Sequence, residues 1–308
     1  MELNILPRSN TERGLMYGVW VAASIAIFWR PLTALVHFAL ENGNASHVLL
    51  IPFISGLVLF HERKQIFHCV SYDFLVAGIL FFLAIFLNGW ALRSGANWSL
   101  ANRLTVYTLA LVLVWIAGFS FFFGRVALNT GRFPFLFLFL SVPLPDFLLN
   151  QIVFFLQKGS TEITAALFDL TGVLYLREGF VFHLARVNIE VARECSGIRS
   201  SMALFTLGML VGHFALRSFW RQSSFVLFGI FVMIVKNGVR IVTLTLLATY
   251  VDPQFLYGNL HREGGVVFFV LGLLMLLPIL WLLQRGETPH QGSSGLPAVQ
   301  TENKPHSV

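Results

Sequence analysis

Three side chains that could perform acyl transfer lie in the last 40% or so of the sequence. Cys195 stands in the run Arg-Glu-Cys-Ser-Gly-Ile-Arg. Arg240 lies inside a long apolar run, and His261 precedes Arg-Glu-Gly-Gly just before the next one. A thiol nucleophile, a guanidinium that stabilises an oxyanion and an imidazole that transfers protons are sufficient for thioester chemistry. Their use depends on whether the fold brings them together.

The surroundings of Cys195 favour a thiolate. Ser196 could cap the apolar helix that follows, and Arg193 and Arg199 flank the thiol. Both a helix N-terminus and nearby cations stabilise the charged form of a cysteine. A buried cysteine acting as a small apolar side chain is the commoner situation, and the local pattern leaves it open. Cys69 has no such setting and is interpreted as structural.

Arg240 is costly where it stands. An arginine inside an apolar span is by default a functional-site hypothesis, and the alternative is a structural pair with a carboxylate or backbone carbonyls. Asn237 lies three residues earlier on the same helical face and could orient the guanidinium. Counted back from Tyr250 at ~1.5 Å per residue, Arg240 lies roughly 15 Å below the outer helix end. Either the site is sunk in a water-filled cavity or the helix ends before Tyr250.

A lone histidine such as His261 is usually a surface residue. Its ordinary pKa near neutrality nevertheless suits a general base or acid. No second histidine, cysteine or carboxylate stands at ligand spacing around Cys195, Arg240 or His261. The sequence therefore predicts neither a metal site nor a cofactor.

The composition is that of a membrane protein. Hydrophobic residues make up 56% of the chain and charged residues 12%, whereas soluble domains average about 25% charged. Mean hydropathy is +0.74. We predict an all-α polytopic protein with about eight transmembrane helices. The net charge of +6 forms no basic stripe with interleaved aromatic residues, so we expect membrane lipid, and no nucleic acid, as a partner.

The predicted spans begin at about residue 15, with an interruption at Arg30-Pro31. They continue at about residues 47–60, 74–92 and 104–123, then with a fifth that begins with 133–140 and ends near Pro143-Leu144-Pro145-Asp146, and then at about 198–216, 225–250 and 266–283. Residues 146–193 mix charged and apolar positions and are predicted to be an outer interfacial segment, with a short hairpin in 172–190. We therefore expect one membrane domain over 1–285 and a disordered cytoplasmic tail over 286–308. No cleavable signal peptide is evident.

The distribution of basic residues predicts a cytoplasmic N-terminus. Nine arginines and lysines then lie on the inner side: Arg8, Arg13, Arg63, Lys64, Arg125, Arg132, Arg217, Arg221 and Arg285. Short outer loops carry only Arg93, Arg103 and Arg262. This orientation places Cys195 and His261 on the outer side. It also makes a disulfide between Cys69 and Cys195 unlikely, because the two fall on opposite sides.

These residues resemble those of the exosortase/archaeosortase family of membrane proteins. The family pattern is a Cys-Ser-Gly motif at the outer end of a span, an Asn-x-x-Arg in a following span, and a later histidine. Here they read Cys195-Ser196-Gly197, Asn237-Gly238-Val239-Arg240 and His261. Weaker echoes are the segments 47–52 (His-Val-Leu-Leu-Ile-Pro) and 143–145 (Pro-Leu-Pro).

The resemblance implies a cysteine transpeptidase or protease in a prokaryotic cell membrane, with its active site on the outer face. Its substrates would be exported proteins that end in a short motif, a hydrophobic helix and a basic terminus. Cys195 would be the nucleophile, Arg240 would stabilise the oxyanion, and His261 would transfer protons. Asn237, Ser196 and Gly197 would support them. Two alternatives remain: a non-catalytic membrane factor, or a lipid-processing enzyme in extracellular polysaccharide export with Arg240 on a phosphate.

Overall fold

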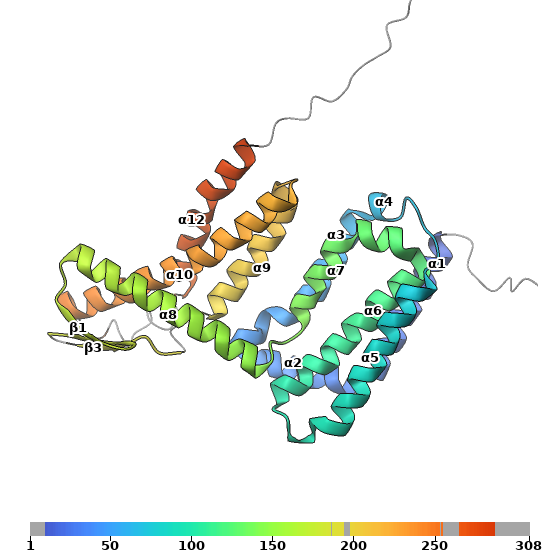
Figure 1. Cartoon of the computed structure of the whole chain (residues 1–308), viewed down its shortest axis with the longest axis horizontal. Helices are drawn as coiled ribbons and strands as arrows, with labels where there is room; N and C mark the ends of the chain where they lie inside the picture. Colours follow the sequence, from blue (N-terminus) through green and yellow to red (C-terminus); the bar gives the residue numbers. More distant parts are fainter. Residues whose placement is uncertain (1–9, 186, 194–197, 253, 255–264, 287–308) are drawn as a thin grey trace, which may run out of the picture.

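A computed structural model of the chain describes residues 10–185, 187–193, 198–252, 254 and 265–286. These residues form helices and one small antiparallel sheet, which confirms the all-α fold class (Figure 1). The α-helices are α1 (Asn10–Ile27), α2 (Trp29–Glu41), α3 (Ile51–His61), α4 (Arg63–Ile66), α5 (Phe74–Ser94), α6 (Leu100–Thr130), α7 (Arg132–Leu138), α8 (Asp146–Thr171), α9 (Ile198–Ala215), α10 (Phe219–Tyr250) and α12 (Gly265–Arg285). Three 3-10 helices are η1 (Gly43–Leu49), η2 (Gly95–Asn97) and η3 (Phe139–Ser141).

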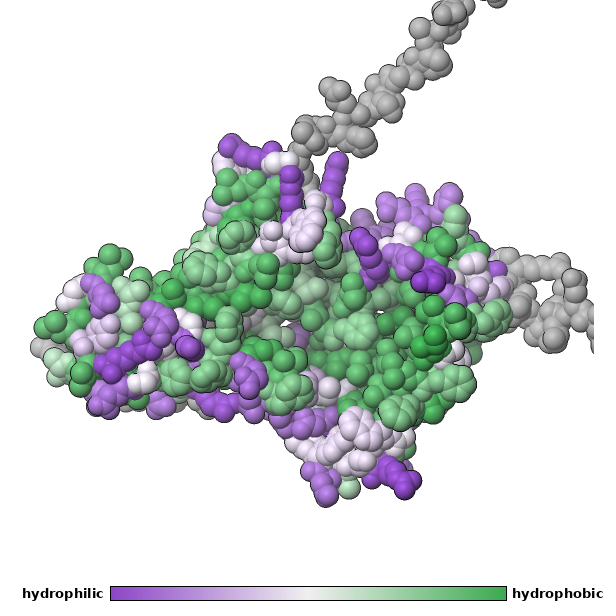
Figure 2. Space-filling model, viewed as in Figure 1, coloured by the Kyte–Doolittle hydropathy of each residue, from purple (hydrophilic) through white to green (hydrophobic). Residues whose placement is uncertain are grey.

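Length and hydropathy identify a multi-pass membrane protein. Six helices within the described residues can cross a membrane, or up to eight if each of two bent helix pairs counts as one span. The upper count agrees with the predicted eight transmembrane helices. Large apolar side chains such as Phe82 (71% exposed) and Phe86 (66% exposed) cover the outer face of α5. Figure 2 shows broad hydrophobic surface over the helices, as expected of helices that face lipid.

The first bend lies slightly earlier than the sequence predicted. Helices α1 and α2 meet at 75°, with the break at Phe28 rather than at Arg30-Pro31. Pro31 falls in the first turn of α2. Proline is tolerated there because the N–H group it lacks would have no intrahelical acceptor.

The predicted fifth span, which begins with residues 133–140 and ends near Asp146, is bent rather than straight. Helix α7 and η3 together cover Arg132–Ser141, about 15 Å at 1.5 Å per residue, against a hydrocarbon core of about 30 Å. They pass as a span only with α8, which turns away by 94° at Pro143-Leu144-Pro145. The interfacial position of residues 146–193 stays a prediction, supported by this right-angled turn.

Helix α6 organises the N-terminal half, packing against α1 and α5. The indole of Trp20 donates to the carbonyl of Val114 at 2.9 Å and lies so close to Gly118 that a Cβ there would overlap it. The α6 backbone changes course at Gly124, where φ is +85° and Ser71 lies against the backbone. Glycine accepts this conformation without steric cost.

Helix α10 has the same role in the C-terminal half, packing against α8, α9 and α12. The sheet has the order β1 (Tyr175–Glu178), β2 (Val181–Leu184), β3 (Asn188–Glu190), so the hairpin expected in residues 172–190 is present with a third strand. The buried side chains of Phe168, Phe182 and Val191 pack on Ile241 and Val242 of α10. The sheet therefore covers the C-terminal part of α10.

The two halves also meet at the ends of α3, α7 and α9 that lie nearest the basic loops. His213 Nε2 and Glu62 Oε1 are 2.6 Å apart, and the Phe133 ring stacks on the imidazole with its centroid at 3.6 Å. They line a cavity of about 870 Å³ with Arg132 and Arg217. The polar contact fixes these three helix ends relative to one another.

Candidate active site

The length of α10 rules out one of the two alternatives for Arg240, the one in which the helix ends before Tyr250. The helix continues to Tyr250 and has 32 residues, or about 48 Å at 1.5 Å per residue. Arg240 is 21 residues beyond Phe219, so it lies about 32 Å from the end of α10 nearest Arg217, which is close to the ~30 Å of a hydrocarbon core. At about 48 Å the helix is longer than the hydrocarbon core is thick, and Arg240 stands about one core thickness along α10 from Phe219.

A buried lysine joins three helices one turn before Arg240. Lys236 is 1% exposed, and its ammonium donates a hydrogen bond to the hydroxyl of Ser200 in the first turn of α9. A Cβ on Gly272 of α12 would lie 3.4 Å from the Lys236 side chain. Lys236 therefore marks a level at which α9, α10 and α12 are in contact.

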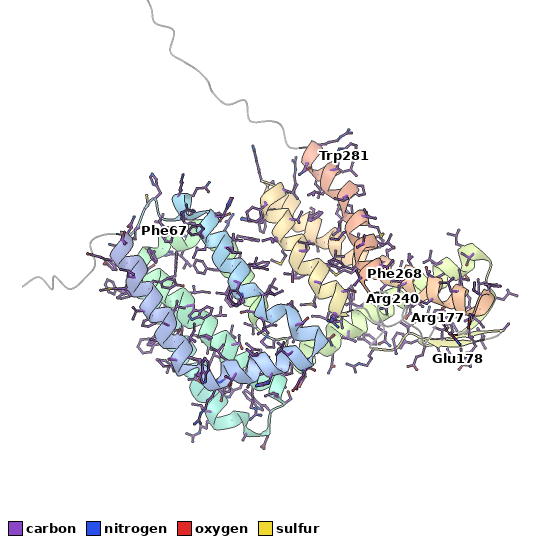
Figure 3. All side chains as sticks on the ribbon, turned by 180° about the vertical axis from the view of Figure 1, so that it is seen from behind. Phe67, Arg177, Glu178, Arg240, Phe268 and Trp281 are labelled. Carbon is purple, nitrogen blue, oxygen red and sulfur yellow. The ribbon has the colours of Figure 1, made fainter. Side chains whose placement is uncertain are left out.

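From this level the three chain segments continue in the same direction. Arg240, which is half-buried, is four residues beyond Lys236 along α10. In the sequence, Cys195 is five residues before Ser200, and His261 is eleven residues before Gly272. Figure 3 shows Arg240 and Phe268, one turn before Gly272, in the region where α10 meets α12. Cys195, Ser196, Gly197 and His261 themselves lie outside the described residues.

A polar seam between α8 and α10 lies beside Arg240. The amide nitrogen of Asn237 donates to Ser160 Oγ of α8 at 3.0 Å. Gly238 allows the helices to approach, because a Cβ there would lie 2.5 Å from Cγ2 of Ile163. The role of Asn237 in orienting Arg240 stays a prediction, whereas its contact with α8 fixes the rotation of the motif.

The seam also holds the chain that leads to residue 194. The Gln157 side chain of α8 donates to the carbonyl of Val191 at 2.6 Å. The guanidinium of Arg193 donates to the side-chain oxygen of Asn150, also on α8. The chain that leads to residue 194 is thus bonded to α8, the helix to which Asn237 also bonds.

Sequence reasoning missed the α8 and α9 members of this arrangement. Four hydroxyl side chains are involved: Ser160, Thr161, Thr164 and Ser200. The first three are fully buried on α8, and two of them donate back to carbonyls one turn earlier. The signal was present as hydroxyl side chains at helical spacing along α8, which indicates a face turned toward a polar partner.

The site is basic where it is described. Lys236 and Arg240 lie on one face of α10, and no described carboxylate forms an ion pair with Lys236 within 4 Å. Farther out, the guanidinium of Arg177 on β1 donates two hydrogen bonds, of 2.7 and 3.0 Å, to the carboxylate of Glu162 on α8, and these bonds raise the pKa of Arg177. No group of three potential metal ligands occurs among the described residues. The arrangement suits a developing negative charge.

The Ser200–Lys236 contact gives a testable effect on stability. Ser200→Ala removes an acceptor from a buried ammonium, so we expect it to lower the free energy of unfolding by about 1–3 kcal/mol. Lys236→Met in the same chain should recover most of that loss, because a buried polar pair replaced by apolar groups of similar shape costs little. Thermal unfolding of the four variants of this cycle in detergent measures it. If Ser200→Ala and the double variant lost the same free energy of unfolding, the contact would not stabilise the position of α9.

Comparison with known families agrees with the motifs. A family model described as transmembrane exosortase matches residues 39–278, which is most of the chain. The chain belongs to the transmembrane exosortase family. No curated protein and no solved structure gave a match. The match runs from before η1 into α12 and includes all six positions of the Cys-Ser-Gly, Asn-x-x-Arg and histidine motifs.

Membership of the exosortase family supports a membrane role of the transpeptidase or protease kind. In this exosortase the Asn-x-x-Arg motif lies on α10, where Asn237 contacts α8 and Lys236 contacts α9. The Asn-x-x-Arg motif on α10 is therefore in contact with α8 and lies beside α9, the helix that follows the Cys-Ser-Gly motif.

Proposed function

We propose that this exosortase cleaves C-terminal sorting signals of exported proteins, with Cys195 as the nucleophile. The observation that carries the proposal is the hydrogen bond between Ser200 and Lys236. It holds the first turn of α9, which follows the Cys-Ser-Gly motif, beside α10 one turn before Arg240. In this proposal the Cys195 thiolate, just before α9, and the Arg240 guanidinium on α10 are close enough to act on the same substrate carbonyl.

In the proposed reaction the Cys195 thiolate attacks the carbonyl carbon of a peptide bond that precedes the substrate's membrane anchor. The new C–S bond moves an electron pair to oxygen, and Arg240 stabilises the resulting oxyanion. Collapse of this intermediate breaks the C–N bond, and protonated His261 gives its proton to the leaving amine. The released product is the anchor, and the substrate remains attached to Cys195 as a thioester.

An amine or water then attacks the thioester carbonyl, and His261 accepts the proton of the nucleophile. The C–S bond breaks and the thiolate returns. An amine acceptor gives transpeptidation, and water gives hydrolysis. Either acceptor reaches the bond more readily at the membrane surface than in hydrocarbon, which fits the level of Arg240 on α10.

The competing function is a lipid-processing enzyme in which Arg240 binds a phosphate. The basic character of the Lys236–Arg240 face is compatible with it. The lipid-processing function differs from the thiol mechanism in one testable respect: such an enzyme would retain its activity without Cys195. The non-catalytic alternative likewise predicts that Cys195 is dispensable.

The topology of the site can be tested directly. We expect a cytoplasmic N-terminus, with residues 194–197 and 255–264 on the outer side, because the basic loops lie at the opposite ends of α9, α10 and α12. Reporter fusions after Lys64 and Gly258, active on one side of the membrane only, should report opposite compartments. A cytoplasmic signal from both would separate His261 from the outer face and refute the shared site.

A further inference from the structure

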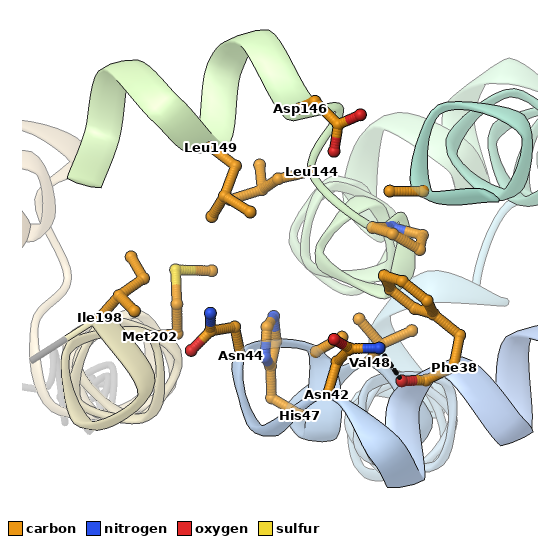
Figure 4. A pocket seen from close by; sticks show the side chains of 13 residues that line it. Phe38, Asn42, Asn44, His47, Val48, Leu144, Asp146, Leu149, Ile198 and Met202 are labelled. Carbon is orange, nitrogen blue, oxygen red and sulfur yellow. Dashed lines mark hydrogen bonds between the residues drawn. The ribbon is translucent and has the colours of Figure 1, made fainter. Parts of the chain in front are cut away.

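A second cavity lies at the other end of α3, α7 and α9 from the His213–Glu62 pair. It has a volume of about 180 Å³, and segments that are far apart in the sequence line it (Figure 4). Its lining residues are Phe38, Asn42, Asn44, Ala45, His47, Val48, Ala101, Pro143, Leu144, Asp146, Leu149, Ile198 and Met202. We call it the outer pocket.

The outer pocket joins the two weaker sequence echoes that the proposed mechanism does not use. The segment 47–52 contributes His47 and Val48, and the segment 143–145 contributes Pro143 and Leu144. The start of α9 contributes Ile198 and Met202. This helix follows Cys195 by three residues in the sequence. The pocket therefore borders the helix that directly follows the proposed nucleophile in the sequence.

One wall of the outer pocket can form hydrogen bonds. The side chains of Asn44 and His47 point into it from η1 (Figure 4), and both carboxamide and imidazole can donate. The amide nitrogen of Asn42 is occupied by the carbonyl of Phe38 at 3.0 Å. The Asp146 carboxylate accepts a hydrogen bond from the Ser99 hydroxyl. Asn44 therefore offers its amide to the space, and His47, whose ring bonds to the backbone of Asn44, offers its second ring nitrogen, which donates when the imidazole is protonated.

The opposite wall is apolar, and the space is limited. Leu149 of α8 and Ile198 and Met202 of α9 face the η1 residues across the pocket (Figure 4). A cavity of about 150 Å³ lined by apolar side chains holds a benzene molecule. A volume of about 180 Å³ thus suits one amino-acid side chain and is far too small for a helix.

We propose that the outer pocket binds one side chain of the substrate's recognition motif, in the exported segment that precedes the anchor. That side chain has an apolar stem, which packs on Leu149, Ile198 and Met202, and a hydrogen-bond-accepting head, a carboxamide or a carboxylate, which Asn44 and His47 bind. The inference rests on the proposed function, because it assigns the pocket to the peptide that Cys195 cleaves.

The test uses a library of reporters in cells that express the full-length protein. Each reporter is a secreted domain followed by six randomised residues, an apolar helix of about 20 residues and a basic end. Sequencing the released reporters gives the preferred residue at every randomised position. For the wild-type protein we expect one position at which glutamine or glutamate is enriched over leucine and methionine, and comparison of those two residues identifies the head.

Variants of the pocket should change that position alone. His47→Leu and Asn44→Leu keep the bulk of the wall and remove its donors, so the enrichment of accepting heads over leucine should fall at least tenfold. Met202→Trp fills the pocket and should shift the preference to smaller residues. The matched controls are Ser46→Leu on the same 3-10 helix and Ala203→Trp on α9, since neither residue lines the pocket and both are exposed.

The outcomes separate the pocket from the catalytic proposal. An unchanged motif in His47→Leu, Asn44→Leu and Met202→Trp, with release still dependent on Cys195, would overturn the pocket and leave the proposed function standing. Release that continues in Cys195→Ala but whose motif shifts in the pocket variants would overturn the thiol mechanism and support the pocket. Folding of each variant is checked by its rate of reaction with a membrane-impermeant maleimide at Cys195, which should stay within twofold of the wild-type rate.

Discussion

Replacing Cys195 with alanine is expected to abolish release of a sorting substrate without loss of the membrane protein. No other group in the proposed mechanism can form the thioester, so the rate should fall to background, a loss on the order of 10⁴-fold or more on the scale of nucleophile deletions. Substrate cleavage in isolated membranes, normalised to folded protein, measures the effect.

Cys195→Ser should also fail or nearly fail. A serine hydroxyl has a far higher pKa than a thiol, and a site that holds a thiolate lacks a base strong enough to activate it. Cys69→Ala is the matched control: the described Cys69 is an exposed free cysteine, so its removal should be nearly silent. Complete processing by Cys195→Ala would end the claim that this thiol is the nucleophile.

Replacing Arg240 with lysine is expected to leave the fold intact and reduce the rate of cleavage by about 10²-fold or more, the loss caused by deleting one oxyanion donor. Lysine keeps the charge but lacks the planar fork that can hold a carbonyl oxygen with two hydrogen bonds. A lysine can extend its ammonium on a long apolar stem toward water, so folding should not fail. The cleavage rate in membranes, with Cys195 alkylation measured in parallel, separates chemistry from folding.

Slow cleavage with normal alkylation places the defect after thiolate formation, where an oxyanion stabiliser acts. Turnover close to wild type in Arg240→Lys would refute that role and favour Arg240 as a simple counter-charge. Val239 on the same helix offers a control position: Val239→Leu adds bulk beside the motif without removing a polar group and should retain most of the activity.

The long apolar helices were predictable because their signal is averaged over about 20 residues. Helices α5, α9 and α12 agree with the predicted spans to within two residues at each end. The break at Phe28 was displaced because a proline in a first helical turn looks like a proline that ends a helix. The fifth span passes only together with α8, because the apolar residues 133–140 are followed by a right-angled turn that hydropathy does not record.

The candidate site was predictable in its residue types and less so in its geometry. Family motifs identified Arg240 and Asn237, but the contact of Asn237 with Ser160 depends on how α8 crosses α10, which no local pattern specifies. Ser200 and Lys236 are 36 residues apart in the sequence, and their contact follows from helix packing alone. Whether Asn237 orients Arg240, and how Cys195 and His261 approach it, stay predictions.

The ten residues of α10 beyond Arg240 fix the position of Arg240 along the axis of the helix bundle. Because α8 and the sheet pack against this section, the guanidinium is held at a fixed distance from the Phe219 end of the helix. A substrate anchored by its own helix presents its peptide bonds at elevations set by that helix's length. The spacing between a cleavable bond and the start of the anchor is then a selection criterion independent of side-chain identity, so two proteins with the same motif but different spacers need not be equal substrates.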